Sequence, residues 1–180
     1  MEVAAREAGE FISGEAEAFS IGKAESKGLN NFVTHVDRES EQMLVNSLGK
    51  LLPEAGFIAE EGTTDKRGSR FNWVIDPLDG TTNFLHNVRP YAVSIALREY
   101  DETIAGVVHE AGGSETFTAW KNGGAWLNGK RISVSATKKL SDSLVATGFP
   151  YNLFDRLDPY MELLSHLVTC THGVRRLGSA

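Results

Sequence analysis

Apolar residues recur at two different spacings along this chain, and the change between them predicts where helices give way to strands. Residues 2–19 carry apolar side chains at helical intervals among charged ones, and residues 34–52 do the same, with Thr34 as a predicted N-cap and Pro53 as the stop. Beyond Pro53 the spacing changes to two, which is typical of strands. The first predicted strands are 57–59, 71–75 and 91–97.

Paired turn residues mark the connections between the strands that follow. Asp101-Glu102 and Gly112-Gly113 flank an apolar run at 104–109, and both read as hairpin connections. Asn122-Gly123 and Asn128-Gly129 are stronger turn signals, because Asn and Gly accept positive φ. The pattern therefore predicts consecutive antiparallel strands.

The last forty residues change character again. Residues 143–148 predict a buried strand, Asp158-Pro159 predicts the cap and first residue of an amphipathic helix, and residues 173–177 predict another strand. Two helices, a meander and a strand-helix-strand unit predict an α+β fold. We expect an N-terminal α+β domain over residues 1–138 and the start of a C-terminal α/β domain over residues 139–180.

Composition narrows the class of protein. The chain has 180 residues, of which 41% are hydrophobic and 23% charged, so a packed core is expected rather than disorder. The formal net charge of −6 argues against a general nucleic-acid or anionic-membrane surface. No apolar run is long enough for a membrane span, and a single cysteine, Cys170, can form no internal disulfide. A cytoplasmic protein with no membrane partner is the expectation.

An acidic cluster is predicted at the end of the second strand. Asp76 follows the apolar run 73–75 and precedes Pro77, which cannot donate to a sheet ladder, so we expect the strand to end at Asp76. Asp79 comes three residues later, in a turn that lets both carboxylates face one point. Two carboxylates held so close repel each other unless a cation or a proton neutralises them. Hard oxygen donors favour Mg²⁺.

The neighbouring residues suit a phosphate group. Gly80, Thr81 and Thr82 offer a backbone without a side chain, two hydroxyl groups and, if a short helix follows, free N–H groups at its positive end. Glu60 and Glu61 follow the preceding strand. Because neighbours on an extended segment point to opposite sides, we expect one of these two glutamates to reach the acidic cluster.

These motifs resemble those of a known family. Phe57-Ile58-Ala59-Glu60-Glu61 and the block from Trp73 to Phe84 are similar to the paired motifs of the inositol monophosphatase family, which are Mg²⁺-dependent, lithium-sensitive phosphomonoesterases. The similarity extends in the family's order to 32–37, 123–129 and 175–180, and so covers essentially the whole chain. It implies a layered αβαβα sugar phosphatase fold, a homodimer and a small substrate such as inositol monophosphate or another sugar or polyol phosphate.

The resemblance also implies residue roles. The Mg²⁺ ligands would be Glu60, Asp76, the Leu78 carbonyl and Asp79. Gly80 and Thr81 would contact the substrate phosphate, in a substrate site that also includes Glu60, Leu78 and Asp79. Thr81 and Glu60 would position or activate the attacking water beside the metal, and Asp37 would support Thr81. The hydrolysis would be a direct in-line attack, without a covalent phosphoenzyme.

Two other functions stay open on the sequence. The family has a further metal-binding aspartate in its C-terminal domain, and no residue up to Ala180 supplies it, so we expect these residues to form one wall of the active site. The chain could then be a non-catalytic module that binds a metal or an anion. A related phosphatase acting on fructose 1,6-bisphosphate or a 3′-phosphonucleotide is the other alternative.

Overall fold

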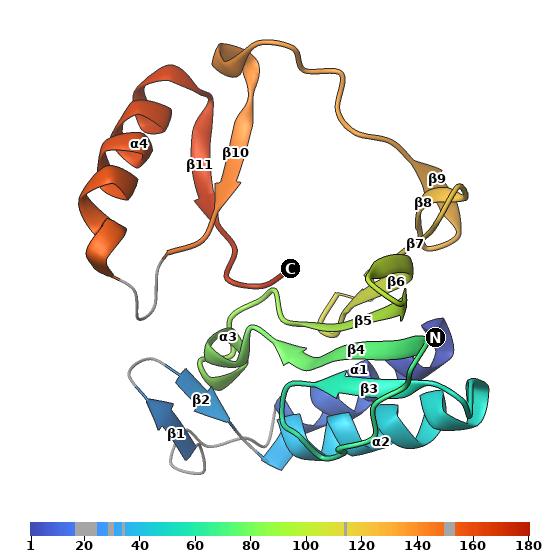
Figure 1. Ribbon diagram of the computed structural model, residues 1–180. Coiled ribbons are helices and arrows are strands. Elements are labelled where there is room, and N and C mark those ends of the chain that lie inside the picture. The colour runs from blue at the N-terminus through green and yellow to red at the C-terminus, as the bar shows by residue number, and fades with distance from the viewer. Residues whose placement is uncertain (17–24, 29–30, 34, 114, 150–153) are drawn as a thin grey trace.

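A seven-stranded sheet with two long helices on one face dominates the computed structural model, which describes residues 1–16, 25–28, 31–33, 35–113, 115–149 and 154–180 (Figure 1). Its strands lie in chain order, and β3 and β4 are parallel whereas every later pair is antiparallel. The predicted meander is therefore confirmed. The strands are β3 (Gly56–Ala59), β4 (Phe71–Asp79), β5 (Ala92–Glu99), β6 (Glu102–Glu110), β7 (Glu115–Trp120), β8 (Gly124–Leu127) and β9 (Lys130–Ile132).

The two helices cover one face of this sheet because each presents an apolar stripe to it. α1 (Glu2–Ala16) buries Ala8 and Ile12, and α2 (His35–Leu51) buries Leu44 and Leu48, in one core with β3 to β6. Both predicted helices are confirmed over these spans. The predicted N-cap Thr34 and the predicted extension of the first helix to residue 19 lie outside the described residues.

The end of β4 differs from the prediction. The strand does not stop at Asp76 but continues to Asp79, with an irregularity between these residues, after which Asp79 pairs with Ala92 of β5. Pro77 has no N–H to donate, so the ladder is interrupted there and not ended. The bulge leaves both aspartates on the same short stretch of strand.

Short elements complete the chain around this sheet. α3 (Thr81–Leu85) directly follows β4, and β1 (Glu25–Gly28) pairs antiparallel with β2 (Asn31–Val33). β10 (Leu144–Thr147) and β11 (Gly173–Arg176) form a separate parallel pair that is joined by α4 (Leu157–Cys170), as predicted for a strand-helix-strand unit. The 3₁₀ turns are η2 (Leu140–Asp142) and η3 (Phe154–Arg156).

Two details of this last unit correct the prediction. β10 alternates between exposed and half-buried residues, so it is not the buried strand that its apolar composition suggested. α4 begins at Leu157 with Arg156 as N-cap, so Asp158-Pro159 lies inside the first turn. Pro159 is tolerated there because the first-turn N–H groups have no partner within the helix.

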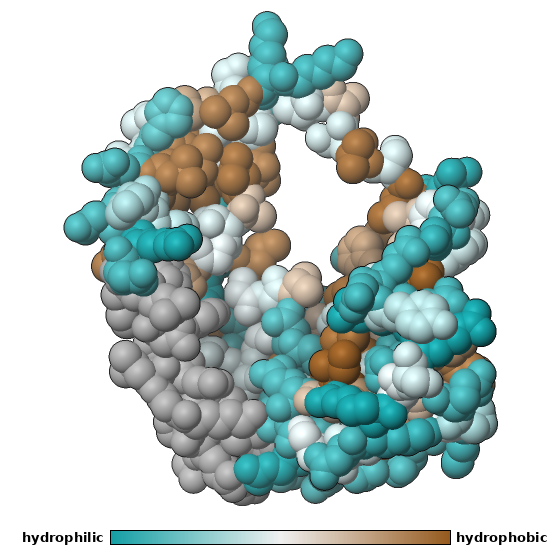
Figure 2. Space-filling model, viewed as in Figure 1, coloured by the Kyte–Doolittle hydropathy of each residue, from teal (hydrophilic) through white to brown (hydrophobic). Residues whose placement is uncertain are grey.

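The face of the large sheet opposite α1 and α2 is apolar and open. A groove of about 340 Å³ runs across it, lined by residues of β5 to β9 that include Val108, Phe117 and Ile132. β10, β11 and α4 stand on that side of the sheet, and the chain returns from β11 towards α3 (Figure 1). Apolar side chains also gather over α4 and β10 (Figure 2). Every helix in the described residues is too short or too polar to cross a bilayer.

Gly56→Ala is expected to destabilise the protein by about 2 kcal/mol or more. A Cβ at Gly56 would lie 1.9 Å from the backbone nitrogen of Gly68, because the chain after β3 folds back along that strand. Urea unfolding measures the change. Gly14→Ala in α1 is the control, since a Cβ there meets no atom within 4 Å, and it should leave the protein as stable or more stable. Equal stability of the two variants would contradict this close approach.

Candidate functional site

The bulge at the end of β4 places Asp76 in an unfavourable electrostatic position. Burial, the Glu60 carboxylate and the Asp79 carboxylate together raise the pKa of Asp76 to about 8. One stabilising contact opposes this, a hydrogen bond of 3.2 Å that the Leu78 N–H donates to Asp76 Oδ1. The neighbouring carboxylates thus disfavour the charged form of Asp76, as expected for acids held close together.

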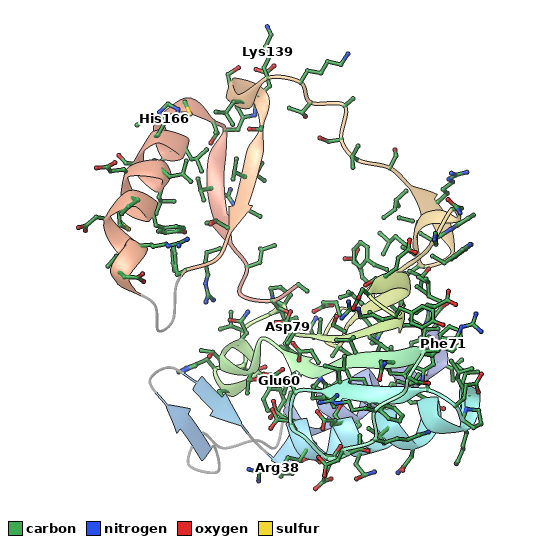
Figure 3. The ribbon with its side chains drawn as sticks, viewed as in Figure 1. Arg38, Glu60, Phe71, Asp79, Lys139 and His166 are labelled. Carbon is green, nitrogen blue, oxygen red and sulfur yellow. The ribbon has the colours of Figure 1, made fainter. Side chains whose placement is uncertain are left out.

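Glu60 joins this cluster from the neighbouring strand. It directly follows β3, and because β3 and β4 are parallel, Glu60 and Asp79 lie at the same end of the sheet (Figure 3). The Glu60 carboxyl group is close enough to Asp76 to be one of the causes of its raised pKa. Of the predicted pair of glutamates, Glu60 thus approaches the cluster with its side chain. Glu61 instead faces α2 with its backbone N–H.

Asp79 is held by the last residues of the chain. Ser179 Oγ lies 2.9 Å from Asp79 Oδ2 and also 2.9 Å from the Asp79 carbonyl oxygen, and the Ala180 N–H donates to Oδ2 as well. Within the described residues, no group of three or more His, Cys, Asp or Glu side chains converges as a ready-made metal site. The donor chemistry of Glu60 and Asp76 suits a divalent cation, because carboxylate oxygens are hard ligands and the neighbouring acids raise the pKa of Asp76. The Asp79 carboxylate would join them only after turning from Ser179.

Thr81 connects this cluster to α2. Its hydroxyl lies 3.1 Å from Asp37 Oδ1 and 3.0 Å from the Leu78 carbonyl oxygen, and Asp37 is almost completely buried. Asp37 could have been a solvated residue on the outer face of its helix. The structure instead places it in contact with Thr81.

Two further residues of α2 reach the site, and the sequence did not single them out. Ser40 Oγ donates to the Pro77 carbonyl oxygen at 3.2 Å. Glu41 is fully buried and accepts backbone N–H groups from Glu61 at 2.7 Å and from Thr63 at 2.8 Å. Their spacing from Asp37, three and four residues along a helix, puts all three on one face. That spacing was the signal that could have found them.

Gly80 has a backbone conformation that favours glycine. It is the N-cap of α3 with φ of 90°, which lies in the left-handed region. A Cβ at Gly80 would approach Ser179 Cβ to 3.0 Å, so the C-terminal segment already occupies part of the space beside this glycine. A cavity of about 360 Å³ opens next to it, lined by Asp79, by residues 146–148 at the end of β10, and by residues 177–179.

This combination of layers and carboxylates belongs to the sugar phosphatase class of folds. The chain is a member of the inositol monophosphatase family, whose family model matches residues 1–180. Among curated relatives it is 42% identical to the Nus factor SuhB of Pseudomonas aeruginosa over 98% of this chain and 67% of the relative. It is 37% identical to the inositol-1-monophosphatase of Rhizobium meliloti over 94% of this chain and 66% of the relative.

Solved structures agree with this assignment. The extragenic suppressor protein suhB of Bartonella henselae superposes with a TM-score of 0.90 at 35% identity, covering 98% of this chain and 68% of that one. An IMPase of Thermotoga maritima superposes with a TM-score of 0.87 at 32% identity, covering 98% and 66%. The predicted family and the layered fold are thereby confirmed. The chain spans about two thirds of the length of these relatives.

Proposed function

We propose that the protein is a Mg²⁺-dependent phosphomonoesterase that hydrolyses inositol monophosphate or a similar small sugar or polyol phosphate. The observation that carries this proposal is the Asp76 carboxyl group, partly buried between Glu60 and Asp79 with its pKa raised to about 8. Neighbouring carboxylates repel one another, and a bound divalent cation would compensate that repulsion. Family membership supports phosphatase activity of this general kind.

The residues of the site would have distinct roles in metal binding and catalysis. Glu60, Asp76, Asp79 and the Leu78 carbonyl oxygen would hold Mg²⁺. The bound ion would supply Lewis-acid stabilisation of the phosphoryl oxygens and of the leaving oxygen.

Thr81 has one hydroxyl proton, which it gives to Asp37 or to the Leu78 carbonyl oxygen, so its lone pairs are free to accept a hydrogen bond from a water molecule. Thr81 and Glu60 would orient that water for attack on the phosphate. Asp37 would fix the direction of the Thr81 hydroxyl.

The cavity beside Asp79 favours a small substrate. Its volume of about 360 Å³ lies at the lower end of the range for small-molecule sites, roughly 300 to 1,000 Å³. Gly80 and Thr81 directly follow Asp79 in the chain and would contact the phosphate. A monosaccharide-sized or inositol-sized ester would fit in this space.

Phosphate release provides the test of this function. The full gene product is expected to release phosphate from inositol 1-phosphate with Mg²⁺ and to lose that activity in EDTA, with recovery on adding Mg²⁺ back. Fructose 1,6-bisphosphate and a 3′-phosphonucleotide are parallel substrates that separate the related phosphatases. Turnover at an equal rate in EDTA would refute the proposal.

A non-catalytic binding role is the second candidate. It is favoured by the hydrogen bonds that Ser179 makes to Asp79, which occupy a carboxylate that catalysis needs, and by the name Nus factor that the Pseudomonas relative carries. Mg²⁺ binding by the full gene product without phosphate release from any of these substrates would support this role. The homodimer, the cytoplasmic location and the domain boundary at residues 138 and 139 stay predictions.

A further inference from the structure

We propose that Glu41 is a positioning residue for the divalent-metal site, and that its carboxylate fixes the turn after β3 from which Glu60 projects. The inference rests on the proposed function, because Glu41 would act on the metal site only by positioning Glu60. It extends the set of residues that serve the site to a side chain that touches neither metal nor substrate.

The contacts of Glu41 are those of an anion held by a backbone turn. Its carboxylate is fully buried, and each oxygen accepts one backbone N–H: Oε2 from Glu61 and Oε1 from Thr63. Between these two donors stands Gly62 with φ of 70°, a left-handed conformation that lets neighbouring N–H groups converge. Because a buried carboxylate is costly unless hydrogen-bonded, these two bonds hold the turn firmly.

The turn is connected to the metal site by a single peptide bond. The N–H that donates to Glu41 Oε2 belongs to the peptide unit that joins Glu60 to Glu61, so fixing this N–H also fixes the backbone of Glu60. The Glu60 carboxyl in turn reaches Asp76 across the parallel pair of strands β3 and β4. Glu41 therefore restrains Glu60 against Asp76 without lying beside the cation.

The position of Glu41 on α2 supports the same role. Asp37, one helical turn earlier, contacts Thr81, and Ser40 contacts the backbone of the β4 bulge at Pro77. Asp37, Ser40 and Glu41 lie on one buried face of α2. They contact Thr81, the β4 bulge and the turn after β3, respectively. Buried polar residues that served stability alone would have no reason to collect at this end of the sheet.

Glu41→Gln is the variant that tests the inference. Glutamine keeps the shape of the side chain, but it has one acceptor oxygen and one NH₂ group, so one of the two backbone N–H groups loses its partner and faces another donor. Calorimetric titration of the full gene product with Mg²⁺ alone is expected to show a dissociation constant about 10- to 100-fold higher than in the wild type. Substrate and turnover play no part in this measurement.

Glu39→Gln is the matched control, because it removes the same charge from the exposed face of the same helix. It should change the Mg²⁺ dissociation constant less than twofold. If Glu41→Gln is folded and binds Mg²⁺ as tightly as the control, Glu41 is only a structural residue and the inference is wrong. A wild-type protein that binds no Mg²⁺ would instead refute the proposed function itself.

Amide hydrogen exchange in the wild type keeps the inference testable should Glu41→Gln fail to fold. Saturating Mg²⁺ is expected to slow exchange at the Glu61 and Thr63 amides by about tenfold, since fixing Glu60 also restrains the turn. The Gly123 amide, in the hairpin between β7 and β8, is the control and should not change. Unchanged exchange at Glu61 and Thr63 in protein that binds Mg²⁺ would overturn the inference.

Discussion

Asp79→Asn is expected to lower the rate of Mg²⁺-dependent phosphate release by the full gene product about 1,000-fold or more. The neutral amide has the shape of the carboxylate but is a weak ligand for a hard cation, so several kcal/mol of charge stabilisation are lost. The fold should survive, because the amide oxygen can still accept the hydrogen bond from Ser179. Steady-state kinetics and urea unfolding of the same preparation measure both effects.

Asp65→Asn is the control for this substitution. Asp65 lies exposed in the segment between β3 and β4. Its substitution by Asn removes the same charge at a position away from the cluster. Its rate should stay within twofold of the wild type. An Asp79→Asn protein that keeps more than a tenth of the wild-type rate would show that this carboxylate is not a metal ligand.

The stability of the metal-free protein is expected to fall as the pH rises from about 5 to 8. Burial and the carboxylates of Glu60 and Asp79 raise the pKa of Asp76 from 3.8 to about 8. Between those two values the folded chain holds a proton that the unfolded chain has already released, so the free energy of unfolding decreases with pH. A shift of this size corresponds to at most about 6 kcal/mol.

Mg²⁺ should reverse this loss, because the cation replaces the proton among the carboxylates. Thermal unfolding in EDTA and in Mg²⁺ therefore has to be compared at pH 5.5 and at pH 8. The increase in Tm with Mg²⁺ is expected to be larger at pH 8, and Asp76→Asn should abolish most of the pH dependence. A Tm in EDTA that is equal or higher at pH 8 would contradict the electrostatic description of the site.

Local sequence patterns were sufficient to predict most of the helices and strands of the fold. The helical spacing before Pro53 and the Asn-Gly pairs predicted α1, α2 and the antiparallel meander, because such signals depend on neighbours in sequence. The end of β4 could not be predicted in this way. A proline in a strand predicts a break, but the pairing of Asp79 with Ala92 is a long-range contact that restores the ladder beyond it.

The site shows the same division between local and long-range information. Glu60 directly follows β3, Asp76 and Asp79 are among the last four residues of β4, and Thr81 comes two residues later. Their closeness in sequence to strand ends was the basis for predicting an acidic cluster. The contacts of Glu41 with Glu61 and Thr63 depend on how α2 packs on the sheet, and those of Asp79 with Ser179 join residues one hundred positions apart. The exposed side of β10 likewise depends on tertiary packing, which its apolar sequence does not reveal.

Anomalous diffraction from a crystal of the full gene product grown with Mn²⁺, as a substitute for Mg²⁺, tests the metal site most directly. The expected result is a peak within coordinating distance of carboxyl oxygens from Glu60, Asp76 and Asp79, with the Asp79 side chain turned away from Ser179. A crystal that shows Mn²⁺ only elsewhere, with Asp79 still bonded to Ser179 and no density between Glu60 and Asp76, would contradict the account.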